Sequence, residues 1–293
     1  ENPLLSLHSM GGGAAGTLMQ GAGEKFYIDD YFKWSLWQGN NTIGRDIVNN
    51  IDIADKGGMV WAKKRELEDH IIVDTLRGAN NFLIVNDSDA QSTANSISAF
   101  NSNGFTVDNN GYVNGNSSTY VGWTFAKKEK FFDCVTYTGN GVAGRTISHS
   151  LDSTPGFILV KRTDSAQDWA VYHRSVGATK VFYLNSTGTP VTDSEPWNDT
   201  EPTSSVFTVG THAMVNASSA TYVAYLFAHD AGGFGEDDGS VISCGGYTGN
   251  NNASGPTVTL GWEPQYLMIK RISGGGGGQW TIFDSGRGVH TGS

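Results

Sequence analysis

Apolar and polar residues alternate with a period of two along much of this 293-residue chain, as they do in β-strands. The clearest stretch is FFDCVTYTG at 131–139, where aromatic and branched side chains alternate with polar ones. The same pattern, bounded by Gly, Pro, Asn and Asp, predicts further strands at 145–151, 154–162, 168–174, 180–186, 205–210 and 221–230. This part of the chain is therefore predicted to consist of short strands joined by polar turns.

Several phrases of the sequence recur at intervals of about 100 residues. CVTYTGNGVAGRT begins at Cys134, its near-copy CGGYTGNNNASGPT begins at Cys244, and WSLWQGNNTIGRD keeps the same frame from Trp34. The strand pattern follows these phrases, which predicts further strands at 58–65, 103–110, 113–126, 261–271 and 279–288. Internal repetition of this kind indicates tandem structural units.

One segment, AKKRELEDHIIVDTLRGA at 62–79, has the composition of a helix, with Glu and Lys at helical spacing. Its counterparts in the other two units contain a turn at the centre, TDSAQ in one and SGGGGG in the other. Five consecutive glycines do not support a helix, because glycine loses more backbone freedom on folding than any other residue. We therefore predict strand, loop and strand over 62–79 as well.

Seven or eight short strands per unit predict an all-β fold of tandem antiparallel β-sandwich repeats, jelly-roll-like, of about 100 residues each. Strands do not alternate with helices, which excludes a parallel α/β sheet. The predicted organisation is an N-terminal Gly-rich segment at 1–30, a first sandwich repeat at 31–130, a second at 131–239 that ends in an acidic Gly-rich linker, and an incomplete β repeat at 240–293.

Composition narrows the classes of partner. Charged residues make up 16% of the chain and the formal net charge is −10, so the basic stripe of a nucleic-acid-binding protein is absent. Lys127, Lys128 and Lys130 are interpreted as a solvated connector. Because a basic stripe is absent, no nucleic acid is expected as a partner. No apolar window reaches 18 residues, so no membrane is expected as a partner either.

The two cysteines, Cys134 and Cys244, occupy equivalent positions, where the first unit carries Trp34. A position that accepts Trp requires bulk inside a core, which favours small buried hydrophobes over a disulfide between repeats. Neither a Cys-x-x-Cys pair nor a His cluster occurs, so no zinc site is predicted.

Candidate chemistry is confined to a few recurring acids. Asp74 and Asp284 lie in DTLRG and DSGRG, each three residues before an arginine, Arg77 or Arg287. The second unit has HRSVG at 173–177 instead. An acid paired with an arginine beside a Gly turn is far more often a structural ion pair than a catalytic site, and we interpret both in that way.

The remaining polar clusters do not define a site either. Loops 233–240 and 86–89 are rich in oxygen ligands, but neither has the spacing of an EF-hand, and acidity of a linker is the preferred interpretation over Ca²⁺ binding. No catalytic, cofactor-binding or metal-binding residue is therefore predicted, and no cofactor. The seven histidines lack metal-ligand spacing and are interpreted as surface or turn residues: His8, His70, His149, His173, His212, His229 and His290.

The long phrases together resemble a known family. FFDCVTYTGNGVAGRTISHSLDSTPGFILVKR, DWAVYHRSVGATK and VNASSATYVAYLFAHDAGGFGEDDG resemble a repeat domain found in virion structural and tail-fibre-like proteins of tailed bacteriophages, especially marine phages. The resemblance extends from about residue 27 to 288. It implies a structural role on the virion surface and brings no catalytic residues.

We therefore expect a non-enzymatic virion structural protein of tail-fibre or surface-decoration type, which can also serve host attachment. Its expected partners are other virion proteins and further copies of itself. Two alternatives stay open: a carbohydrate-binding adhesion module for host surface glycans, and a subunit of an extracellular filament. The first requires exposed aromatic platforms, whereas Trp169, Trp262 and Trp280 are assigned to core packing.

The third unit carries strands predicted within 244–250, 261–271 and 279–288, but has no counterpart of SVFTVG or TYVAYLFA. Half a sandwich leaves open edges and an apolar face. Either the natural chain continues past Ser293, or a neighbouring subunit supplies the missing strands by β-augmentation. Residues 240–293 are expected to be ordered mainly through contact with the preceding repeat or with another chain.

Overall fold

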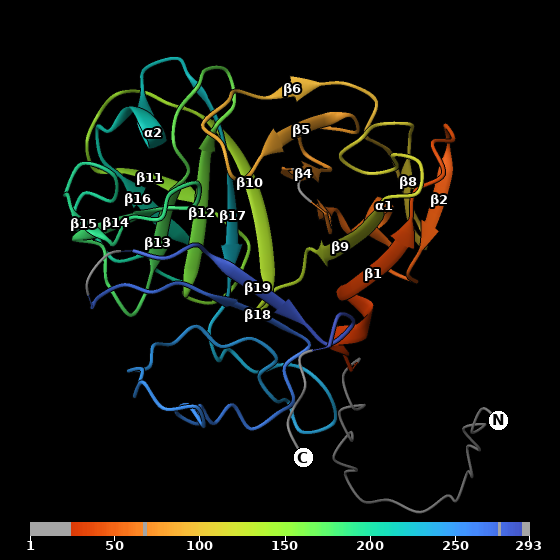
Figure 1. The fold of residues 1–293 in the computed structure, drawn as a ribbon. Helices are drawn as coiled ribbons and strands as arrows, with labels where there is room; N and C mark the ends of the chain where they lie inside the picture. The colour runs from red at the N-terminus through yellow and green to blue at the C-terminus, as the bar shows by residue number, and fades with distance from the viewer. Residues whose placement is uncertain (1–24, 67–68, 275–276, 289–293) are drawn as a thin grey trace, which may run out of the picture.

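A computed structural model describes residues 25–66, 69–274 and 277–288 (Figure 1). Regular structure in this part is almost entirely β, which confirms the predicted all-β fold with antiparallel sheets. None of the helices in these residues is long and apolar enough to span a membrane. The helices are single turns: η1 (Ile28–Asp30), α1 (Ile53–Lys56) and α2 (Ala213–Asn216).

Six strands form the first sheet, in the spatial order β1-β9-β3-β4-β5-β6, with every neighbouring pair antiparallel. A three-stranded sheet, β2-β8-β7, belongs to the same stretch of chain. The strands are β1 (Phe32–Gln38), β2 (Arg45–Val48), β3 (Gly58–Lys64), β4 (His70–Asp74), β5 (Asn81–Ile84), β6 (Ser92–Thr93), β7 (Ile97–Asn101), β8 (Gly104–Val107) and β9 (Thr119–Ala126).

The second sheet has the same plan, with the order β10-β17-β12-β13-β14-β15 and a small sheet, β11-β16, beside it. In each six-stranded sheet the last long strand, β9 or β17, therefore lies between the first strand and the third. The strands are β10 (Phe132–Thr138), β11 (Arg145–Ser148), β12 (Phe157–Arg162), β13 (Ala170–His173), β14 (Lys180–Tyr183), β15 (Val191–Thr192), β16 (Val206–Val209) and β17 (Thr221–Phe227).

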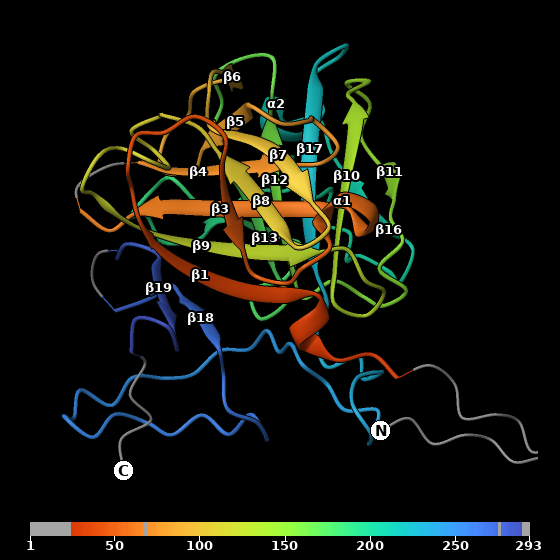
Figure 2. The same cartoon turned by 90° about the vertical axis from the view of Figure 1, so that its right-hand side faces the viewer.

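A further sheet, which we call the third sheet after the two large ones, contains among the described residues only β18 (Tyr266–Ile269) and β19 (Thr281–Asp284). Figures 1 and 2 show this hairpin below the two six-stranded sheets. Its side chains reach both of them, because Tyr266 packs on Trp123 while Trp280 packs on Phe157. The division of the chain into domains of about 100 residues stays a prediction.

Most of the predicted strands are present. The segment 62–79 contains the end of β3 and all of β4, so the prediction of strand, loop and strand is confirmed against its helical composition. The strand predicted within 244–250 is wrong, because these residues form no strand. Its counterparts are β1 and β10, which among the described residues pair with a single strand each, β9 and β17. Within the same residues, no strand equivalent to β9 or β17 lies beside the segment 244–250. Gly245 and Gly246 weaken it further.

Both faces of the second sheet are buried. Along β17, Val223, Tyr225 and Phe227 face a core shared with the first sheet, whereas the residues between them face β11 and β16. A strand buried on both faces needs apolar residues at nearly every position, which explains the run TYVAYLF. The second sheet is therefore the middle layer of this half of the molecule.

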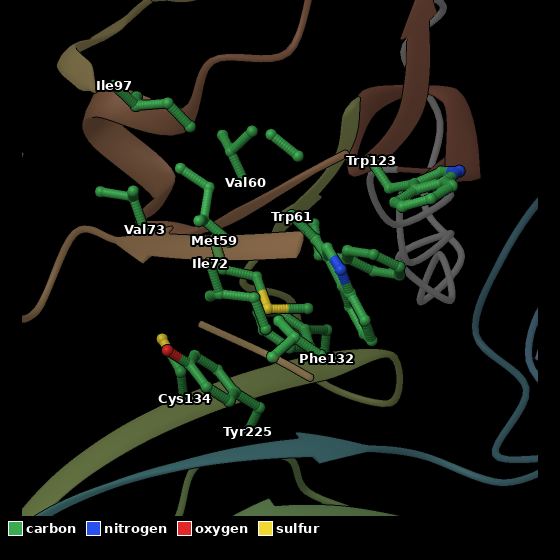
Figure 3. Packing of buried hydrophobic residues seen from close by; sticks show 14 of the residues in the cluster. Met59, Val60, Trp61, Ile72, Val73, Ile97, Trp123, Phe132, Cys134 and Tyr225 are labelled. Carbon is green, nitrogen blue, oxygen red and sulfur yellow. The ribbon is translucent and has the colours of Figure 1, made fainter. Parts of the chain in front are cut away.

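The shared core joins the two large sheets. Figure 3 shows Met59 and Ile72 of the first sheet on the side of Cys134 and Tyr225 of the second, with Val73 on the opposite side of its strand. Cys134 is 1% exposed, which agrees with its prediction as a small buried hydrophobe. Both cysteines are free thiols, and burial raises the pKa of the half-buried Cys244 to about 12.

Candidate functional site

A buried ion pair lies at the turn after β4. The Asp74 carboxylate accepts hydrogen bonds from the backbone N–H groups of Leu76 and Arg77, at 3.1 and 2.9 Å, and from Arg77 Nε at 2.6 Å. The Tyr225 hydroxyl of β17 donates to the same carboxylate oxygen at 2.6 Å. Since Asp74 is fully buried, this pair links the first sheet to the second inside the core.

The same arrangement is built at the turn after β19. Asp284 accepts from Arg287 N at 2.8 Å and from Arg287 Nε at 2.6 Å, while Trp123 Nε1 of β9 donates to it at 3.1 Å. The Arg287 guanidinium lies 5.2 Å from the centre of the Trp123 ring. This pair links the third sheet to the first. Both predicted ion pairs are thus confirmed.

The third member of each cluster was not predicted from the sequence. Tyr225 lies 151 residues from Asp74, and Trp123 lies 161 residues from Asp284. Each is the fifth residue of its strand, β17 or β9, and this equivalence within the repeated phrase TYVxx is the only signal that relates them.

The corresponding turn after β13 carries His173 instead of an acid. The backbone N–H of Ser175 donates to His173 Nδ1 at 3.1 Å, so the imidazole caps its own turn as Asp74 does. Burial lowers the pKa of His173, the nearby Arg174 and His229 act in the same direction, and together they bring it to about 4. Among the described residues no strand equivalent to β9 or β17 lies against this turn.

A second kind of link joins the sheets near the start of β13 and β19. Trp169 Nε1 donates to the carbonyl of Ile84 at 2.9 Å, and Trp280 Nε1 donates to the carbonyl of Tyr183 at 3.1 Å. The buried Lys161 also reaches across, because its ammonium donates to the carbonyl of Ser88 in the first unit at 2.9 Å. Burial lowers the pKa of Lys161 to about 8.

His70 holds the position of Trp169 and Trp280 at the start of β4. Trp61 Nε1 donates to His70 Nδ1 at 3.3 Å, which requires that nitrogen to be unprotonated. Burial lowers the pKa of His70 to about 3, and the cationic Lys63 and Arg287 face it. The neutral imidazole is therefore the form that the folded protein accepts.

Acid is expected to destabilise the protein through His70. The unfolded state binds this proton near pH 6.5 and the folded state only near pH 3, so the free energy of unfolding falls as the pH is lowered through this interval. Urea titrations between pH 7 and pH 4 should show a shallower fall for His70→Gln than for the wild-type protein. Equal slopes for the two proteins would contradict this assignment.

One interpretation of a charged residue needs correction. Lys127 is not a solvated connector, because its ammonium lies 2.8 Å from the carboxylate of Asp133, which is buried. In the acidic loop 233–240, Glu236, Asp237 and Asp238 are exposed. Phe234 is buried there, and Glu236 accepts a hydrogen bond from the Tyr27 hydroxyl.

The other predicted positions add no chemistry. His149 lies at a turn, as predicted, but is 8% exposed and therefore buried rather than at the surface. His8 and His290 lie outside the described residues. Within those residues no group of three or more His, Cys, Asp and Glu could hold a metal ion. All eight tryptophans lie in the described part, and none of them is exposed, Trp169 being fully buried and Trp262 and Trp280 partly buried.

The third sheet differs from the other two in its edge and in its outer face. β3 and β12 each pair with two strands, whereas in the described part of the chain β18 pairs only with β19. Phe283 of β19 is 45% exposed, while Tyr172, its counterpart in β13, is 2% exposed. Tyr247 is 54% exposed. We call the free side of β18, together with the segment 242–248, the open edge.

The fold and these links define an all-β protein in which antiparallel sheets are joined around a common core by buried ion pairs. The chain belongs to the family of a domain of unknown function, DUF7483, whose model matches residues 28–292. No curated protein matches the chain. No solved structure matches it either.

Proposed function

We propose that this chain is a non-enzymatic structural subunit of a bacteriophage particle, of the tail-fibre or surface-decoration type, displayed on the virion surface. The observation that carries the assembly role is the open edge of β18. An uncovered strand edge beside exposed apolar side chains is a template for association, which soluble proteins otherwise protect. Neighbouring virion proteins or further copies of the chain are the proposed partners.

The buried charges also support a structural role. Asp74 and Arg77 are hydrogen-bonded to each other and to a second sheet, and so are Asp284 and Arg287. Both pairs have a carboxylate that accepts hydrogen bonds from its own turn and from another sheet. They make the arrangement of the sheets specific, which suits a subunit that must present a fixed surface to its neighbours.

The assignment to phage comes from the resemblance of the repeated phrases, and it can be tested on particles. Purified virions of a phage that encodes the chain should contain it at a fixed copy number by quantitative mass spectrometry. Immunogold labelling should place it on the outside of the particle. Its absence from virions, when it is abundant in the infected-cell lysate, would exclude this function.

A further inference from the structure

Within the described residues Tyr247 has no stacking partner of the kind that its two counterparts have. Trp37 of β1 stacks on Tyr120 of β9, with ring centres 5.5 Å apart, and Tyr137 of β10 stacks on Tyr222 of β17 at 5.1 Å. The rings are within 15° of parallel in both pairs. Each partner is the second residue of the strand that lies alongside. The third position of this kind is exposed.

His173 marks a second position at which a strand equivalent to β9 and β17 would place a side chain. The fifth residues of β9 and β17 donate to carboxylates at the two equivalent turns. Cys244 lies beside Gly156, and Gly246 faces Ser175, so the segment 242–248 runs next to the turn that holds His173. Cys134 pairs with Tyr225, the fifth residue of β17, so by equivalence a strand alongside Cys244 would place its fifth residue opposite that cysteine.

The side chain at the turn after β13 offers a hydrogen-bond donor, whereas the side chains at the other two turns offer acceptors. Because His173 Nδ1 accepts the Ser175 N–H, the neutral ring carries its hydrogen on Nε2. It offers a hydrogen-bond donor, whereas Asp74 and Asp284 offer acceptors. A side chain that approaches this ring must therefore supply an acceptor, which a tyrosine oxygen can do and an indole cannot.

The backbone of β18 also indicates where a further strand would pair. In the first sheet β9 forms a ladder with β3 on one side and β1 on the other, and β17 does the same with β12 and β10. Met268 of β18 holds the position of Trp61 and Leu159, which pair with the fifth residues of those strands. A strand at the open edge would complete the pattern already made twice.

We propose that β18 accepts an antiparallel β-strand from a neighbouring polypeptide chain, with an aromatic second residue that stacks on Tyr247 and a fifth residue whose acceptor faces His173. Main-chain hydrogen bonds along the free edge of β18 give the strand its affinity, and its side chains give the specificity of binding. The inference rests on the proposed function, because an assembly is what brings a neighbouring chain to this edge.

The probe is a labelled peptide with the sequence of β17, Thr-Tyr-Val-Ala-Tyr-Leu-Phe, flanked by lysines for solubility. Fluorescence anisotropy with the full chain should show saturable binding that a scrambled peptide with the same flanks lacks. Phe in place of the fifth residue removes one hydrogen bond and should weaken binding by about fivefold. Trp at that position, a donor only, should weaken it at least as much.

Variants of the chain identify the site. Tyr247→Ser should weaken peptide binding by about fivefold through loss of the stack. Val142→Ser is the matched control, because Val142 is 61% exposed on a loop of the second unit, and it should leave binding unchanged. Equal binding of the scrambled peptide, no effect of Tyr247→Ser, or self-association that the peptide does not displace would each overturn the inference.

The outcomes separate this inference from the proposed function. Peptide binding with the predicted preferences, in a chain that is absent from virions, would retain strand capture and remove the phage assignment. A chain present in virions that binds no strand peptide would retain the assignment and remove strand capture.

Discussion

Replacing Asp74 with alanine is expected to lower the free energy of unfolding by about 3–5 kcal/mol, because a buried cation then loses its partner. The side chain of Arg77 is only 5% exposed, and its Nε lies 2.6 Å from Asp74. The Tyr225 hydroxyl also loses its acceptor. Urea denaturation followed by tryptophan fluorescence measures the loss.

The equivalent cluster at the third sheet provides a matched comparison. Arg287 is 26% exposed, so water can solvate its charge when the partner is removed, and Asp284→Ala should cost less than Asp74→Ala. Combining Asp74→Leu with Arg77→Met should also cost less than Asp74→Ala, since no unpaired charge stays buried. A loss below about 1 kcal/mol for Asp74→Ala would show that the pair is not a desolvated one.

Replacing Trp169 with alanine is expected to cost about 3–5 kcal/mol. The side chain is fully buried, it stacks on Tyr225 with ring centres 6.3 Å apart, and its Nε1 donates to the carbonyl of Ile84. The substitution leaves a cavity in the shared core and an unsatisfied carbonyl between the two large sheets. The same denaturation experiment measures the result.

Trp262→Ala is the control for that experiment, because Trp262 is only partly buried and lies outside the strands. Its replacement should cost about 1 kcal/mol or less. Similar losses for the two variants would mean that Trp169 does not hold the sheets together.

The strands could be predicted from the sequence because alternation is a local property. Phe132 and Cys134 lie at positions that the period of two assigns to one face of their strand, and the structure places both in a core. The repeated phrases added information for 62–79, where local composition alone favours a helix. The equivalent segments carry a turn at the centre, one of them with five consecutive glycines, which indicates strands on either side of a loop.

The links between sheets could not be predicted, because they depend on how separate units pack. The Asp74–Arg77 pair is visible as a spacing of three, but nothing near it indicates Tyr225. The strand expected within 244–250 failed for a related reason. A strand is stable only beside a partner that satisfies its backbone, and repetition of a phrase does not supply that partner.

The link between Trp123 and Asp284 cannot form until both residues have been synthesised, and they are 161 positions apart in the chain. At about 5–20 residues per second, a ribosome needs on the order of ten to thirty seconds to travel between them. The two large sheets can already dock by then, because their own link closes at Tyr225. Until the last hairpin is synthesised, the indole N–H of Trp123 therefore lacks the Asp284 carboxylate, its acceptor in the folded chain.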